Sequence, residues 1–160
     1  MTDNLIRTKG SDRIQINNIL AAACIAILSV LLGLSGQRFS NSMVLQLAMA
    51  TPLLVTSSLA YAKLCYRSLK ECPVWDNLGW VTLSLGYIML LNALVIMLYT
   101  DGYWAASWWF VGAIVSLFVI YSVLDIFASR KRLVEKLWKL GFYLALMSCG
   151  SVLPMVAGWV

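Results

Sequence analysis

Few residues in this sequence have side chains suited to catalysis, and histidine is absent. The commonest metal ligand and the usual general base at neutral pH are therefore missing. Asp125, in the stretch YSVLDIFASRKR, is the one charged residue inside a long apolar segment. A lone acid without a second acid at its level is poor support for general acid–base catalysis. We therefore expect no enzyme, no catalytic residue, no metal site and no cofactor.

Asp125 is a candidate functional residue, because placing an ionisable group inside a membrane segment costs free energy and such groups are usually functional. It lies close to the end of its apolar segment, so the first interpretation is a shallow membrane acid paired with the basic residues that follow. Arg130 and Lys131 are the expected partners. The alternatives are a proton or cation site at a pore mouth and a salt bridge between subunits.

A layer of polar residues in two neighbouring apolar segments is the second candidate site. In ATPLLVTSSLAYAK, Pro52 has no N–H and frees the carbonyl of Ala48. We predict that the amide of Asn92 caps this carbonyl or pairs across a subunit interface. The layer either provides packing contacts between helices or lines a polar path. Its members are Thr56, Ser57, Ser58, Ser84 and Asn92.

Two further features have a structural and a functional interpretation. In YTDGYWAASWWF, residues 99–110, Asp101 and Gly102 predict a tight turn flanked by aromatic residues. These aromatics form an interfacial belt or grip a cationic or aromatic ligand. The four cysteines are best interpreted as ordinary small residues, with lipid attachment at Cys65 or Cys72 as the alternative.

The elements that carry these residues are membrane-spanning helices. The chain is 61% hydrophobic and only 12% charged, with a mean hydropathy of +0.83. A chain of 160 residues cannot hide so much apolar surface in its own core. We predict an all-α, polytopic integral membrane bundle with five transmembrane helices, preceded by a cytoplasmic tail at 1–16 and forming a single membrane domain at 17–160. The expected spans are about 17–36, 43–64, 78–99, 104–128 and 137–159.

The positive charges predict how this bundle is oriented. With five spans, every Lys and Arg except Arg38 falls on one set of alternate sides. Short loops rich in Lys and Arg stay in the cytoplasm. The amino terminus is therefore predicted to be cytoplasmic and the carboxyl terminus outside, in the cell (inner) membrane. The tryptophans all fall near predicted interfaces, which agrees with this orientation.

The basic stretch SRKRLVEKLWKL, residues 129–140, is predicted to be a helical elbow lying at the cytoplasmic membrane surface. Leu133, Val134, Leu137 and Trp138 share one helical face, opposite the cations. These cations are expected to contact anionic lipid headgroups. No folded basic domain is present, so nucleic-acid binding is not expected. The predicted headgroup contacts are Arg130, Lys131, Arg132, Lys136 and Lys139.

Small residues four apart recur in several spans, as in Gly112/Ser116 and Gly141/Ala145/Cys149. Such spacing lets helices approach closely, within one chain or between chains. We therefore predict a non-catalytic membrane protein acting through helix–helix contacts, as a subunit, assembly factor, or sensor or immunity component of a membrane complex. Other membrane chains or copies of itself are the expected partners. The alternatives are a small homo-oligomeric channel or transporter and, less supported, a lipid enzyme.

Overall fold

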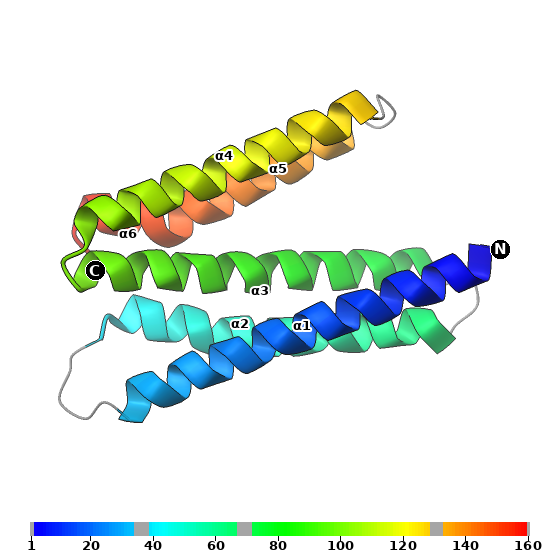
Figure 1. The fold of residues 1–160 in the computed structure, drawn as a ribbon, viewed down its shortest axis with the longest axis horizontal. Coiled ribbons are helices and arrows are strands. Elements are labelled where there is room, and N and C mark those ends of the chain that lie inside the picture. Colours follow the sequence, from blue (N-terminus) through cyan, green and yellow to red (C-terminus); the bar gives the residue numbers. More distant parts are fainter. Residues whose placement is uncertain (1, 34–38, 67–71, 129–132, 160) are drawn as a thin grey trace. The chain divides into compact units, whose positions relative to one another are not determined.

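The computed structural model describes residues 2–33, 39–66, 72–128 and 133–159, and within these ranges the protein is helical with no strand. The predicted all-α class is confirmed. Figure 1 shows the helices in chain order. They are α1 (Thr2–Gly33), α2 (Asn41–Tyr66), α3 (Cys72–Thr100), α4 (Trp104–Ala128), α5 (Leu133–Met147), the π-helical turn η1 (Ser148–Val152) and α6 (Leu153–Ala157).

Five helical segments in the described chain are long and apolar enough to cross a membrane, as predicted. They have 24 to 28 residues each, so at about 1.5 Å per residue each exceeds the roughly 30 Å hydrocarbon core. Together they indicate a multi-pass membrane protein. The segments are Gly10–Gly33, Asn41–Cys65, Pro73–Thr100, Trp104–Phe127 and Leu133–Ala157.

Three helices begin well before the starts that the sequence pattern indicates. Helix α1 begins at Thr2, inside the predicted tail, and α3 begins at Cys72 instead of near 78. Helix α5 begins at Leu133 and continues without a break into the last span. The predicted elbow is therefore, from Leu133 onward, the start of the span itself; its first part, 129–132, lies outside the described residues. Charged residues do not end a helix when they can extend towards the headgroups.

The chain divides into two compact units, and α3 contributes to both. Unit 1 contains α1, α2 from Val44 and α3 as far as Leu90. Unit 2 contains 39–43 and everything from Leu91 onward. Helix α3 is also the most enclosed span, with 56% of its most apolar window buried.

Unit 1 owes its tight packing to glycines on α3. A Cβ on Gly79 would lie 2.8 Å from the ring of Tyr61, and one on Gly86 would lie 2.9 Å from Leu54 Cγ. Real Cβ atoms do not approach other atoms this closely, so only glycine lets these side chains of α2 pack against the backbone of α3. Buried apolar side chains, including Leu54 and Ala50, complete the unit.

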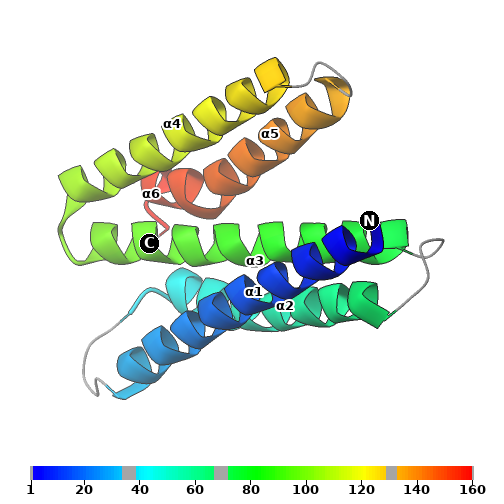
Figure 2. The same ribbon diagram turned by 45° about the vertical axis from the view of Figure 1, so that its right-hand side comes forward.

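In unit 2, α4 and α5 pack against each other along their length (Figures 1 and 2). The rings of Phe118 and Tyr143 stack between them, with centroids 5.1 Å apart. A second cluster joins the end of α3, the start of α4 and α6 through Val95, Val111 and Met155. The predicted turn between α3 and α4 is confirmed: Gly102 has φ +86°, a conformation that favours glycine.

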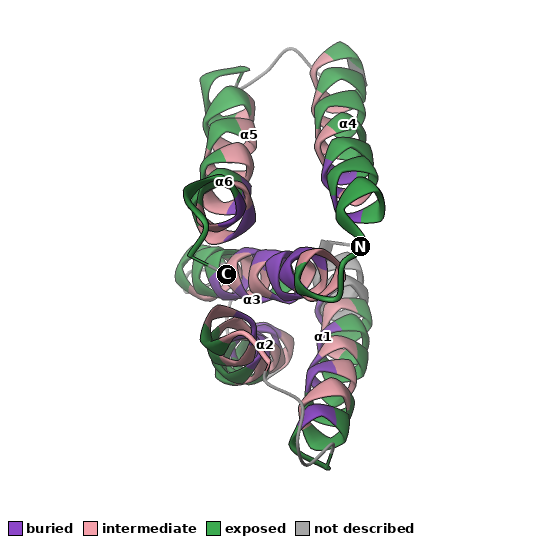
Figure 3. Cartoon of the chain, turned by 90° about the vertical axis from the view of Figure 1, so that its left-hand side faces the viewer, coloured by how far each residue is buried: buried purple, intermediate pink, exposed green. Residues whose placement is uncertain are grey.

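The outer surface of these helices is strongly apolar. Figure 3 shows long exposed faces on α4 and α5, where most side chains lack protein cover. Trp109 is 81% exposed and Val134 is 80% exposed. Exposed faces of this kind would be unstable in water but suit a lipid environment. They therefore agree with the membrane assignment.

Candidate functional site

A buried chain of hydrogen bonds links the three helices of unit 1. Asn17 of α1 donates from Nδ2 to Ser57 Oγ at 2.8 Å, and Ser57 Oγ donates to the carbonyl of Gly79 at 2.8 Å. Asn17 and Ser57 are completely buried. The Asn17 Oδ1 atom is also buried and accepts no hydrogen bond from the described residues. This inner layer thus places polar groups of α1, α2 and α3 in contact.

A second layer lies one helical turn away and carries charge. Arg13 of α1 precedes Asn17 by four residues, and Tyr61 of α2 follows Ser57 by four, so each pair shares a helical face. Arg13 Nη1 donates to the hydroxyl of Tyr61 and lies 3.4 Å from Asp76 Oδ1 of α3. The guanidinium carbon also lies 4.9 Å from the centre of the Tyr61 ring, a cation–π contact.

The predicted polar layer of the second and third spans is only partly brought together. Ser57 belongs to the inner layer, and Ser58 donates from its hydroxyl to Asn18 Oδ1 at 3.0 Å. Ser84 is 4% exposed on α3, whereas Thr56 is exposed. Thr56 follows Pro52 by four residues on the outer face of α2, and both are exposed. Asn92 belongs to unit 2 and is described separately.

Five polar members of the unit 1 site were missed in the sequence: two lie in the predicted tail and loop, and three lie near the ends of predicted spans. These residues are Arg13, Asn17, Asn18, Tyr61 and Asp76. A signal was present: Arg13 and Asn17 are spaced four apart, and a continuous helix from the tail into the first span would place both on one face. The helix start, rather than the residues, was predicted wrongly.

In unit 2, the buried amide of Asn92 bonds to the last span. Asn92 Nδ2 donates to the carbonyl of Leu146 at 3.2 Å, immediately before η1. The predicted acceptor, Ala48, was therefore wrong. Asn92 is 2% exposed, and its Oδ1 atom accepts no hydrogen bond among the described residues. The amide thus caps a carbonyl of the last span, and its pairing across a subunit interface stays a prediction.

The irregular turn next to Asn92 has a local cause. In η1, hydrogen bonds run between residues five apart, as from the N–H of Leu153 to the carbonyl of Ser148. The next residue, Pro154, has no N–H and cannot continue this pattern. A Cβ on Gly150 would lie 2.0 Å from Asn92 Nδ2, so the amide fits only against glycine.

Asp125 forms an ion pair with α5. Lys136 Nζ lies 3.0 Å from Asp125 Oδ2, and it also donates to the backbone carbonyl of Asp125. The side chain of Lys136 is only 16% exposed, so it faces α4 rather than the surface. Lys139 pairs with Glu135 at 2.7 Å, the helical i,i+4 spacing. Arg130, Lys131 and Arg132 lie outside the described residues.

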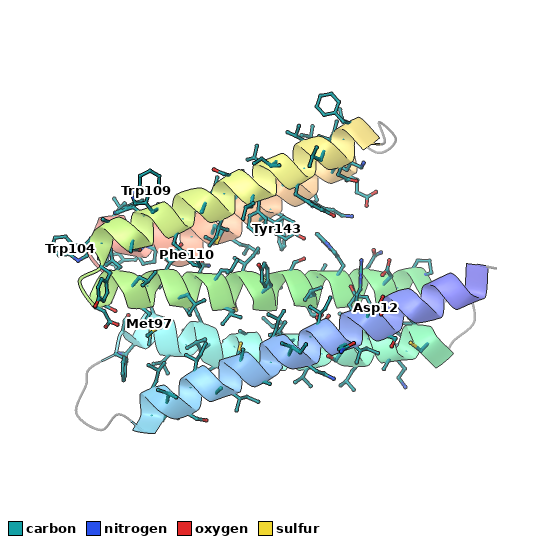
Figure 4. The ribbon with its side chains drawn as sticks, viewed as in Figure 1. Asp12, Met97, Trp104, Trp109, Phe110 and Tyr143 are labelled. Carbon is teal, nitrogen blue, oxygen red and sulfur yellow. The ribbon has the colours of Figure 1, made fainter. Side chains whose placement is uncertain are left out.

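The aromatic residues after the Asp101–Gly102 turn mostly face outwards. Trp109 and Trp104 point away from their helix in Figure 4, and both are largely exposed. The Trp104 ring lies 6.3 Å from that of Tyr99, in a tilted contact. An outward-facing aromatic set at a helix end is typical of a membrane interface.

The small residues four apart also face outwards on α4 and α5. A Cβ on Gly112 or Gly141 would meet no atom of the described chain within 4 Å. Ser116 follows Gly112 on the exposed face, and Ala145 and Cys149 follow Gly141 on theirs. These faces are thus not used in packing the described chain, in contrast to Gly79 and Gly150.

The described residues contain no group of three or more His, Cys, Asp or Glu able to hold a metal ion. No protein-family model, curated protein or solved structure matches the chain. Inference about function therefore depends on the contacts described above.

Proposed function

We propose that the chain is a non-catalytic protein of the cell (inner) membrane, with a cytoplasmic amino terminus and an outer carboxyl terminus. It acts as a subunit, assembly factor, or sensor or immunity component of a membrane complex, through contacts between its helices and those of other chains. Cations at the cytoplasmic side, including Lys139, contact anionic headgroups. The orientation rests on the distribution of Lys and Arg.

The outward-facing small residues carry this proposal. Gly112 and Gly141 lie on exposed faces where a larger apolar residue would bury more surface against lipid. Small residues four apart instead permit the close approach of another helix, which favours van der Waals contact in a membrane. The face formed by Gly141, Ala145 and Cys149, called here the α5 face, is the proposed contact.

The internal use of polar groups also supports a role in contacts rather than in transport. Ser57 and Asn92 are buried and bonded inside the chain, which leaves them less suited to line a path. In unit 1, the polar layers are followed by apolar residues: Ala21 and Leu54 are buried one turn beyond Asn17 and Ser57. The channel or transporter alternative therefore receives less support.

Native mass spectrometry of the protein, extracted gently from its own membrane, tests the proposal. We expect a complex of fixed stoichiometry with a different chain. Gly141→Leu is expected to release that chain while leaving thermal unfolding unchanged, since a Cβ at this exposed position meets no atom of the described protein within 4 Å. Gly33→Leu, the same change at an open glycine on α1, is the matched control and is expected to leave the complex intact.

Two outcomes would count against this function. A closed ring of identical chains would favour the channel, and Asn92 and Thr56 would be the next residues to mutate. A monomer alone would contradict any role as a subunit. A complex that survives Gly141→Leu would show that the contact lies elsewhere than on the α5 face.

A further inference from the structure

Arg13 is held through one of its guanidinium nitrogens. Both of its hydrogen bonds to described residues, to the hydroxyl of Tyr61 and to Asp76 Oδ1, come from Nη1. Among the described residues, Nη2 and Nε donate to no protein group, although a guanidinium carries five N–H donors. The ring of Tyr61 supports one face of the group, which keeps it in a defined orientation. Arg13 therefore keeps donors available in a fixed geometry.

The cluster lies at the depth of lipid headgroups. Asp76 lies four residues after the start of α3 at Cys72, and Tyr61 lies five residues before the end of α2 at Tyr66. Arg13 contacts both side chains and therefore lies at the same level. At about 1.5 Å per residue, Asp76 and Tyr61 are about 6–8 Å inside these helix ends. Since the segments are longer than the hydrocarbon core, this depth falls in the interfacial region.

The two charges of the cluster are accessible and only loosely paired. The side chain of Arg13 is 30% exposed and that of Asp76 is 39% exposed. Their contact of 3.4 Å is longer than the roughly 2.7–2.9 Å of a strong charge-assisted hydrogen bond. A carboxylate accepts several hydrogen bonds at once, so Asp76 has capacity for a further donor in addition to the partners it has. A positive and a negative group are thus presented side by side.

We propose that the Arg13–Tyr61–Asp76 cluster binds the headgroup of a zwitterionic phospholipid that carries a phosphate and a primary ammonium, as in phosphatidylethanolamine. The phosphate accepts hydrogen bonds from the unused donors of Arg13, which suit planar, two-point recognition. The ammonium donates to the carboxylate of Asp76. Tyr61 is a positioning residue, because its ring and hydroxyl orient the guanidinium.

The chemistry of the cluster distinguishes this headgroup from the other common ones. An anionic glycerol headgroup supplies the phosphate but no ammonium, so the negative charge of Asp76 opposes it. A choline headgroup has a cationic nitrogen without any N–H, so it cannot donate to Asp76. The carboxylate beside the arginine weakens the attraction of the cluster for a purely anionic ligand.

Lipid retention by the full-length protein tests this proposal. The purified chain is reconstituted in nanodiscs with equal amounts of phosphatidylethanolamine, phosphatidylglycerol and phosphatidylcholine. Lipids that stay bound after release from the disc are then counted by native mass spectrometry. We expect phosphatidylethanolamine to be enriched, and Arg13→Gln to lower that enrichment about tenfold, the effect of losing one charge-assisted contact. Lys136→Gln, which breaks an ion pair in unit 2, is the matched control; because Lys136 faces Asp125 and is only 16% exposed, this variant is expected to leave the enrichment of phosphatidylethanolamine over phosphatidylglycerol unchanged.

Asp76→Asn separates binding from a purely structural role. It removes the charge that selects the ammonium but keeps the shape of the side chain, so preference is expected to move towards phosphatidylglycerol. If the cluster only held the helices together, Asp76→Asn would instead lower the retention of all three lipids equally or leave all three unchanged. This variant also keeps the proposal testable if Arg13→Gln fails to fold. Tyr61→Phe retains the ring and is expected to weaken retention less than Arg13→Gln.

Three results would overturn the proposal. The first is equal or greater retention of phosphatidylglycerol by the unaltered protein, which would indicate general electrostatic attraction. The second is enrichment that Arg13→Gln leaves unchanged. The third is displacement of the lipid by inorganic phosphate added alone, which would assign the cluster to free phosphate instead of a lipid.

Discussion

In the bonds that join different helices, the polar side chains of unit 1 bond mainly to one another, whereas those of unit 2 bond mainly to backbone carbonyls. In unit 1, Arg13 contacts Tyr61 and Asp76, and Asn17 donates to Ser57. In unit 2, the corresponding acceptors are carbonyls. Asn92 donates to Leu146, Ser107 to Val95 at 3.0 Å, and Lys136 to Asp125.

This difference follows from the regularity of the helices. Two of the acceptors in unit 2 lie where α-helical bonding is interrupted or ends: Leu146 precedes the π-helical turn, and Asp125 is in the last turn of α4, whereas Val95 lies within α3. Carbonyls at such places lack an intrahelical donor, and a side chain supplies one. In unit 1, fewer side chains from one helix donate to backbone carbonyls of another, and the polar side chains bond to one another instead. The more specific site is therefore in unit 1, where side chains rather than backbone define the chemistry.

The largest expected effect concerns the close packing of Asn92 against η1. Gly150→Ala places a Cβ 2.0 Å from Asn92 Nδ2 and forces the buried amide away from Leu146. We expect a loss of about 2–3 kcal/mol in the free energy of unfolding. Thermal unfolding in detergent micelles measures this. The same substitution at Gly141, which is open, is the control and is expected to be neutral or slightly stabilising. Equal effects at both glycines would refute the contact.

The next largest expected effect is the coupling between mutations, which should be present in the linked hydrogen bonds of unit 1 and absent from the separate bonds of unit 2. Asn17→Ala and Ser57→Ala remove partners of the same bond, so their effects on stability should be coupled by about 1 kcal/mol. Asn92→Leu and Ser107→Ala share no partner and should be additive within about 0.5 kcal/mol. Two double-mutant cycles, measured by unfolding in the same detergent, provide the comparison. Additivity in unit 1 would mean that its polar layer is not a network.

The smallest expected effects come from the two ion pairs of α5. Lys136→Gln is expected to cost about 1 kcal/mol, because Lys136 is largely buried and also caps the carbonyl of Asp125. Lys139→Gln removes an exposed pair with Glu135 and should cost about 0.3 kcal/mol. Unfolding measured at low and high salt tests this, since screening should reduce only the second effect. A larger cost at Lys139 would contradict the burial of Lys136.

The architecture was predictable because it depends on the period and length of apolar segments. The five spans and the Asp101–Gly102 turn follow from local composition, because an apolar segment in lipid must form a helix to satisfy its backbone hydrogen bonds. Helix starts were less predictable: Arg13 and Lys136 both lie in helices that extend past the apolar residues. Long cationic side chains allow this, because their charged ends reach water or a partner while their stems stay in the helix.

The candidate site was only partly predictable. Ser57 and Asn92 were identified as polar residues inside apolar segments, and both are buried and bonded. Their partners could not be assigned, because the rotation of each helix about its axis determines which residues meet. For the same reason, Thr56 and Ser57 are neighbours in sequence, yet one is exposed and the other buried.

The sequence by itself determined that this protein is helical, that five segments can cross a membrane, and that its charges are confined to their ends. These properties follow from the free energy of transferring each segment to lipid, which depends on composition alone. Only the tertiary structure decided that Arg13 meets Tyr61 and Asp76, that Asn92 caps Leu146, and that Gly141 remains uncovered. Such contacts depend on how each helix is rotated about its axis and how closely the helices pack. The transfer of a helix to lipid hardly depends on its rotation, whereas small residues at the contacts determine which helix faces can approach closely.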